Sequence, residues 1–213
     1  MLPTPAFAES PEGYAPTDRQ SDCAPVARRG VVAFRDFVLK HEGGQDWGIT
    51  RACDKEGRSE HKEGRAWDWH KNASAQDERS SVDRLLGWLL RSDDAGEPHA
   101  LWRRLGLMYV IWDGRIWSTR TRGWQPYGGA SSHADHVHFS FGWPGALAQT
   151  SFFRWLGLPP DLSPHPSPAE PHRPAPGTAS PASADPWRRL AAFTVGLGAG
   201  LGAVVVVGRR WPL

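Results

Sequence analysis

Two stretches of the chain concentrate side chains that commonly bind metal ions. Residues 133–138 (HADHVH) hold three of the chain's nine histidines, and residues 59–68 (SEHKEGRAWD) place His61 seven positions before Asp68. A catalytic zinc ion takes three nitrogen or oxygen ligands from the protein and keeps a fourth position open for water. One His and one Asp from residues 59–68, with one His from residues 133–138, would complete that set, so we expect the two stretches to meet.

The stretch with three histidines has the pattern of a β-strand. Residues 135–141 alternate strictly, so that the two faces of the strand differ. Asp135 shares one face with the apolar side chains of Val137, Phe139 and Phe141, and the other face carries His136, His138 and Ser140. His136 and His138 are therefore expected to point the same way.

The rest of the domain mixes helices and strands without the rhythm of a parallel β-α-β protein. Apolar spacing predicts a helix over 28–41, ended by Gly43-Gly44, and a second helix that begins at a capping box, Ser74-x-x-Asp77. A strand is expected at 49–53, a short helix between Pro98 and Gly106, and a hairpin that joins 108–112 to 115–118 through Asp113-Gly114. These elements predict an α+β fold with a small, mostly antiparallel sheet flanked by helices.

Both histidine-containing stretches also resemble the motifs of a known family. Ser59-x-His61-x-x-Gly64-x-Ala66-x-Asp68 is similar to the first zinc motif of the D-Ala-D-Ala metallopeptidases and related peptidoglycan endopeptidases, the peptidase M15 and LAS group. Asp135-x-x-His138 is similar to their second motif. The chain from 23 to 155 further resembles an uncharacterised domain of secreted actinobacterial proteins. The resemblance implies a Hedgehog/DD-peptidase-like fold and a zinc peptidase.

The resemblance implies roles for individual residues. Zinc would be bound by His61, Asp68 and His138, and Gly64 would allow the tight turn that brings His61 to the site. Asp135 would occupy the place of the general base, which takes a proton from the attacking water. Because strand alternation puts His136 on the same face as the ligand His138, His136 is the competing base.

Four further residues are candidates for contact with the substrate, each with a structural alternative. Arg51, on the strand expected at 49–53, would stabilise the negative charge of a tetrahedral intermediate or would form a surface salt bridge. Ser59 would hydrogen-bond the substrate or cap its own loop. Trp67 and Trp117, two of the chain's 12 Trp, would hold sugar rings of the cell wall or pack in the core.

Both ends of the chain are predicted to lie outside the folded domain, which covers residues 22–157. Residues 1–21, with Ala6-Phe7-Ala8, have the form of an export-signal remnant or of a flexible terminus. Residues 158–187 are expected to form a proline-rich linker, 188–210 a transmembrane helix and 211–213 a tail. The uncharged run at 190–208 would span roughly 28 Å, close to the hydrocarbon thickness of a bilayer, unless it is a buried helix of the domain.

The two cysteines bear on the compartment. In an exported domain Cys23 and Cys53 would form a disulfide, whereas in the cytosol they would be free thiols. A cell-wall substrate, an export remnant and a disulfide all favour a single-pass cell-membrane protein whose catalytic domain is extracytoplasmic and whose C-terminus is cytoplasmic. A formal net charge of +2 and scattered arginines argue against nucleic acid as a partner.

We therefore expect a membrane-anchored, extracytoplasmic zinc metallopeptidase-like hydrolase. Its substrate would be an amide bond of peptidoglycan stem peptides, cleaved as a D,D-carboxypeptidase or an endopeptidase cleaves it. One alternative is a non-catalytic module that binds cell-wall peptides and retains a metal site. Another is a surface interaction domain in which zinc is structural, with His133 or His136 as a fourth ligand.

Overall fold

A six-stranded antiparallel sheet forms the centre of the computed structural model, which describes residues 2–3 and 5–165. The strand order is β1-β2-β6-β3-β4-β5. The strands are β1 (Gln45–Gly48), β2 (Ala66–His70), β3 (Leu107–Trp112), β4 (Arg115–Ser118), β5 (Trp124–Pro126) and β6 (His136–Phe141). The helices are α1 (Arg29–Glu42), α2 (Gln76–Leu90), α3 (Ala100–Leu105), α4 (Trp143–Ala146) and α5 (Ser151–Trp155), with one 3-10 turn, η1 (Glu60–Glu63). The predicted α+β fold with an antiparallel sheet is confirmed.

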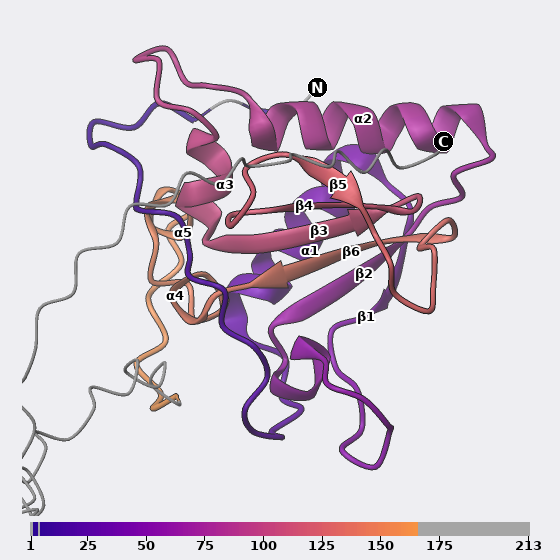
Figure 1. The fold of residues 1–213 in the computed structure, drawn as a ribbon. Coiled ribbons are helices and arrows are strands. Elements are labelled where there is room, and N and C mark those ends of the chain that lie inside the picture. The colour runs from indigo at the N-terminus through magenta and orange to yellow at the C-terminus, as the bar shows by residue number, and fades with distance from the viewer. Residues whose placement is uncertain (1, 4, 166–213) are drawn as a thin grey trace, which may run out of the picture. The chain divides into compact units, whose positions relative to one another are not determined.

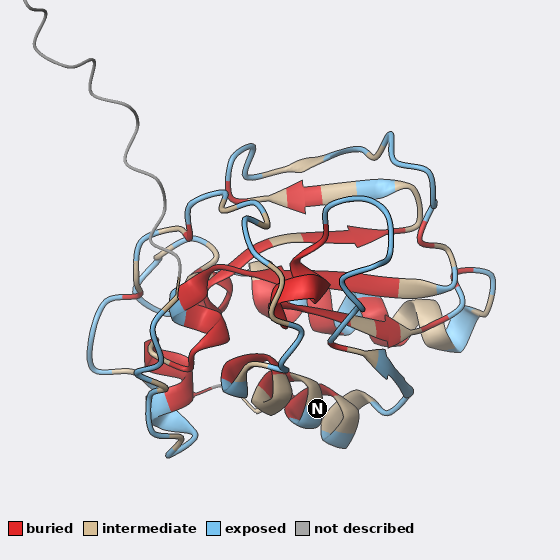
Figure 2. Ribbon diagram, turned by 90° about the horizontal axis from the view of Figure 1, so that it is seen from below, coloured by how far each residue is buried: buried red, intermediate tan, exposed pale blue. Residues whose placement is uncertain are grey.

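Helix α1 covers one face of the sheet and lies behind the strands in Figure 1. The ring of Phe34 lies 5.2 Å from that of Phe139 and 5.9 Å from that of Trp67, measured between centroids. Burial is concentrated in the central strands, as Figure 2 shows. Side chains alternate between the two faces along a strand. Asp68 follows Trp67 on β2 and His138 precedes Phe139 on β6, so Asp68 and His138 project from the opposite face of the sheet.

Residues 5–22, here called the N-terminal strap, lie against the domain. The prediction of a flexible terminus is wrong for these residues. The carboxylate of Glu12 accepts hydrogen bonds from the backbone N–H and the hydroxyl of Ser151, and the carbonyl of Ala15 accepts one from the Thr119 hydroxyl at 2.9 Å. The backbone N–H groups of 21 and 22 donate to the buried carboxylate of Glu63. The strap is thereby part of the folded unit.

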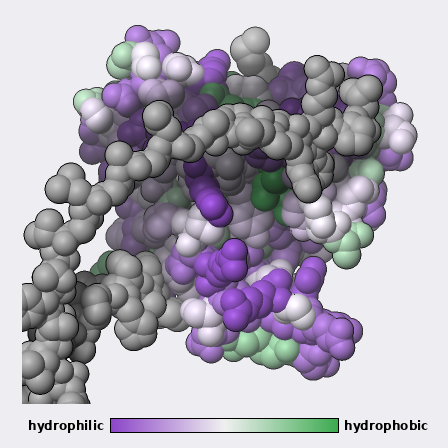
Figure 3. All heavy atoms as spheres, viewed as in Figure 1, coloured by the Kyte–Doolittle hydropathy of each residue, from purple (hydrophilic) through white to green (hydrophobic). Residues whose placement is uncertain are grey.

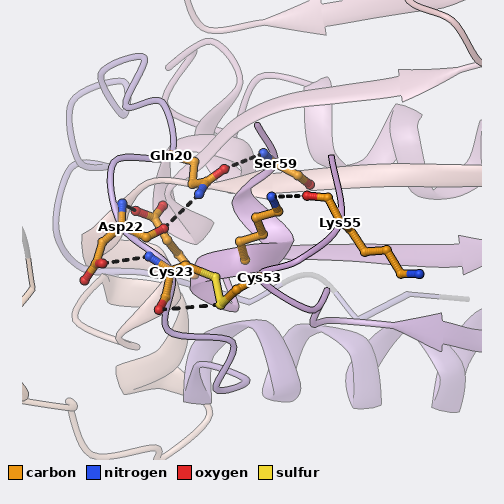
Figure 4. The surroundings of a disulfide bond; sticks show 8 residues. Gln20, Asp22, Cys23, Cys53, Lys55 and Ser59 are labelled. Carbon is orange, nitrogen blue, oxygen red and sulfur yellow. Dashed lines mark hydrogen bonds between the residues drawn. A yellow bond between two sulfur atoms is a disulfide. The ribbon is translucent and has the colours of Figure 1, made fainter. Parts of the chain in front are cut away.

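A disulfide joins the end of the strap to the loop that follows β1. The predicted bond between Cys23 and Cys53 is confirmed, with the two Cα atoms 5.9 Å apart. Figure 4 shows a second tie beside it, in which the side chain of Gln20 accepts a hydrogen bond from the backbone N–H of Ser59 at 2.8 Å. Strap, loop and the start of η1 are therefore held together.

The helix at 28–41, the short helix after Pro98 and the hairpin at Asp113-Gly114 are all confirmed as α1, α3 and β3–β4. Two other local predictions are wrong. Residues 49–53 form a loop, because the strand ends before them, at Gly48 of β1. The backbone N–H of Arg51 donates to the carbonyl of His61 in η1 and not to a neighbouring strand. Ser74 does not cap α2, since the helix begins after Ala75 and has no side-chain cap. The backbone N–H of Ser74 donates to the side chain of Asn72 in the preceding turn.

The predictions for the C-terminal end fall largely outside the described part of the chain. The proposed membrane helix at 188–210 and the tail at 211–213 lie wholly beyond it, and only 158–165 of the linker lie within it. None of the helices that the structure describes has the length and apolar character needed to cross a membrane.

Candidate metal centre

The pairing of β2 with β6 brings the two predicted motifs together. Asp68 lies directly opposite His138 in the antiparallel register, and the Oδ1 atom of Asp68 is 2.9 Å from Nδ1 of His138. The Nε2 atom of His61 lies 3.2 Å from the same Asp68 oxygen and 3.3 Å from His138 Nδ1. The predicted convergence of these three side chains is confirmed, and together they could hold a metal ion.

The third side chain of this group comes from the tight turn η1. Ser59 is its N-cap residue, and the Ser59 hydroxyl accepts a hydrogen bond from the backbone N–H of His61 at 3.4 Å, so the capping alternative for Ser59 is observed. Gly64 ends the turn in the left-handed region with φ of 67°. A Cβ atom at Gly64 would lie 1.9 Å from the carbonyl oxygen of Val26, so this position requires glycine, as predicted.

The imidazole of His61 is held in the tautomer that a metal ligand needs. Its Nδ1 atom lies 2.9 Å from the carbonyl oxygen of Ile49. A carbonyl oxygen can only accept a hydrogen bond, so Nδ1 carries the proton. The lone pair is therefore on Nε2, the atom that faces Asp68 and His138.

The surroundings favour the protonation states that bind metal. Burial opposes ionisation of Asp68, but the neighbouring imidazoles of His138 and His61 outweigh it and hold the pKa of Asp68 below its ordinary value. Burial lowers the pKa of His138, which favours the neutral ring. An ionised carboxylate and neutral imidazoles are the forms in which these side chains coordinate metal ions.

The spacing of the three ligand atoms fits a small tetrahedral ion. Bonds of about 2.0–2.2 Å at tetrahedral angles separate ligand atoms by about 3.3–3.6 Å. The observed separations of 2.9–3.3 Å need only a slight opening to reach that range. The Asp68 side chain stays 17% exposed, and among the described residues neither His133 nor His136 joins the group. The group itself offers three ligand atoms, so a tetrahedral ion bound to it would take its fourth ligand from elsewhere.

Next to these ligands lies a hydrogen-bonded pair, Asp135 and His136. The Nδ1 atom of His136 is 2.7 Å from Oδ1 of Asp135, and its Nε2 atom is 3.8 Å from Oδ1 of Asp68. The hydrogen bond from His136 lowers the pKa of Asp135, whose side chain is 64% exposed. The ring of His136 thus bridges Asp135 and the ligand Asp68.

A family model described as the C-terminal domain of VldE matches residues 23–138. That range is more than half of the chain, and it extends from the disulfide residue Cys23 to the ligand His138. The chain belongs to the VldE C-terminal domain family. No curated protein and no solved structure matches it.

Two predicted substrate contacts of the VldE-type domain are wrong. Trp67 and Trp117 are 0% and 3% exposed, so neither presents a face to a ligand. Trp67 stacks on Phe139 in the core, and Trp117 packs edge-on against Trp102. Arg51 is exposed in the loop after β1, and its backbone is bonded to the carbonyl of His61.

Several residues around the centre were missed by sequence reasoning. Trp47 is 48% exposed and stacks on His70 with ring centroids 4.3 Å apart, and its ring lies 5.6 Å from that of His136. Tyr109 stacks on His138 at 5.6 Å and donates a hydrogen bond to Glu60 at 2.6 Å. No sequence signal could have found them, because these contacts depend on strand order and on an irregularity in the pairing of β1.

The turn at Gly64 generates a stability prediction with a matched control. Gly64→Ala should lower the free energy of unfolding by about 3 kcal/mol or more, since it adds both backbone strain and a clash with Val26. Gly57→Ala should cost only about 1 kcal/mol, because Gly57 has φ of 79° but open space around its Cβ position. Chemical denaturation measures both, and equal losses would contradict the close approach at Gly64.

The ligand group generates a prediction about metal content. The purified protein, stripped with a chelator and titrated with zinc, should bind about one ion per chain. His61→Ala and His138→Ala should weaken that binding by more than the roughly 10–100-fold that loss of an outer partner causes. His41→Ala, on α1, serves as the control and should bind as the native protein does. Native-like affinity in both ligand variants would exclude this site.

Proposed function

We propose that this domain is a zinc-dependent hydrolase that cleaves an amide bond in peptidoglycan stem peptides. The observation that carries the proposal is the convergence of His61, Asp68 and His138 within 3.3 Å of one another beside an unused histidine, His136. Two nitrogen ligands, one carboxylate and an open position are the donor set of catalytic zinc. The motif resemblance to the D-Ala-D-Ala metallopeptidases supports the choice of bond and substrate.

Zinc bound by these three side chains would supply a coordinated water whose pKa falls to about 7. The chain's own residues provide proton transfer. The Nε2 atom of His136, 3.8 Å from Asp68, is positioned to accept a proton beside the ligands and to pass it to the leaving amine. Asp135 accepts the hydrogen bond from Nδ1 of His136 and so orients the ring.

This geometry modifies the roles suggested by the motif. The motif places the general base at Asp135, whereas we assign proton transfer to His136 and orientation to Asp135, because Asp135 reaches the ligands through the ring of His136. Arg51 keeps its proposed role in stabilising the negative charge on the substrate carbonyl. Its exposed place in the loop after β1 leaves its side chain able to move toward a bound substrate.

An extracytoplasmic location is part of the same proposal. The bond between Cys23 and Cys53 supports it, because disulfides persist mainly in oxidising compartments. The predicted membrane segment at 188–210, which lies outside the described residues, would hold the domain next to its cell-wall substrate.

Digestion of purified peptidoglycan fragments tests this function. The zinc-loaded native protein should release new free amines, and mass spectrometry of the products should identify the bond. His136→Ala should lower the rate by about 100-fold or more, the contribution expected of a proton-transfer group. Asp135→Asn should lower it by at least about tenfold, because the ring loses its oriented partner.

The control is Asp36→Asn, which changes a similarly exposed carboxylate on α1 and should leave the rate unaltered. Binding of the fragments without release of amines by the native protein would support the non-catalytic cell-wall module instead. A native rate in His61→Ala would show that the metal centre does not perform the reaction.

A further inference from the structure

A cavity of about 490 Å³ opens on the sheet face that carries the metal ligands. The strap at 17–20 forms one wall, and β3, β4 and the residues leading into η1 form the others. Its volume falls in the range of about 300–1,000 Å³ that small-ligand sites occupy. Figure 3 shows this face of the molecule, with hydrophilic residues gathered over the loops below the sheet.

Side chains of the cavity wall pack against the metal centre. Tyr109 lines the cavity, and its ring is stacked 5.6 Å from that of His138. Tyr127 lines it as well, with its ring 5.2 Å from that of His133. Glu60, a third lining residue, directly precedes the ligand His61. A ligand in the cavity would therefore lie beside the metal ligands.

Three arginines on the cavity wall carry its charge. Arg19, Arg58 and Arg120 are exposed, and none of them forms an ion pair with a carboxylate in the part of the chain that the structure describes.

Two carboxylates, Asp18 and Glu60, line the same cavity as these three arginines. Glu60 accepts the hydrogen bond of the Tyr109 hydroxyl. Three arginines against two carboxylates make the cavity wall cationic by one charge, and Tyr109 and Tyr127 line it with aromatic rings.

We propose that this cavity binds the carboxylate-bearing part of an acidic peptide through Arg19, Arg58 and Arg120. A guanidinium group binds a carboxylate with two parallel hydrogen bonds, which gives it both strength and direction. The proposal rests on the proposed function, which places a peptide amide at the metal centre. It adds that the carboxylate-bearing part of the peptide determines which peptide binds. It involves residues outside both zinc motifs, and one of them belongs to the strap.

A binding experiment on chelator-treated full-length protein tests this cavity without catalysis. The probes are dansyl-Ala-Glu-Glu-Ala amide and the matched peptide dansyl-Ala-Gln-Gln-Ala amide, followed by fluorescence anisotropy. The native protein should bind the acidic peptide at least tenfold more tightly. The triple variant Arg19→Gln, Arg58→Gln, Arg120→Gln should lose that preference, and the corresponding Lys variant should recover part of it.

A control triple variant removes the same charge elsewhere: Arg29→Gln, Arg84→Gln, Arg154→Gln. It should keep the preference, and thermal unfolding verifies that both triple variants are folded. Equal affinity for the two peptides in native protein, retained preference in the cavity variant, or loss in the control variant would each overturn the proposal. So would inorganic phosphate that binds more tightly than the acidic peptide.

The outcome is separable from that of the proposed function. Selective binding without any hydrolysis of wall fragments would leave the cavity assignment standing and remove the enzymatic one. Hydrolysis that persists in the cavity triple variant, together with equal binding of the two peptides, would do the reverse.

Discussion

The antiparallel register between β2 and β6 is the constraint on which the metal centre depends. It sets Asp68 directly opposite His138, with their side chains on the face away from α1. A slip of one residue would turn Asp68 into the core and bring a neighbouring tryptophan to the site. The register is held from the other face, where Trp67 and Phe139 are fully buried beneath Phe34. The apolar core therefore determines where the polar ligands meet.

The third ligand depends on loop geometry that a sheet does not provide. His61 lies on a four-residue turn, and three different ties hold it: the left-handed glycine at 64, the Ile49 carbonyl on its ring, and the strap. The strap bonds to Ser59, the N-cap of the turn, and to Glu63, its last residue, and the disulfide at Cys23 directly follows the strap. The same strap forms a wall of the cavity beside the ligands, so one segment both positions a ligand and shapes the neighbouring pocket.

The three ligands were named by the motif resemblance, and local spacing supports two parts of that prediction. Alternation along β6 puts His138 on a defined face, and the pattern around Gly64 specifies a tight turn near His61. The wrong predictions concern residues whose burial and partners are set by contacts with distant parts of the sequence. An exposed tryptophan can stack on a sugar ring, but Trp67 is buried under α1. Residues 5–22 show no helix or strand periodicity, yet they bind to Glu63 and Ser151. The stacking of Trp47 on His70 depends on a pairing irregularity that no pattern in the chain reveals.

The central claim is that three side chains hold one metal ion and leave a coordination position open. A crystal structure of the zinc-loaded protein, with anomalous diffraction recorded on both sides of the zinc edge, tests it most directly. The account predicts a single strong zinc peak within about 2.0–2.2 Å of His61 Nε2, His138 Nδ1 and an Asp68 oxygen, with water as the fourth ligand. A peak at other residues, or a fourth ligand supplied by His133 or His136, would contradict it.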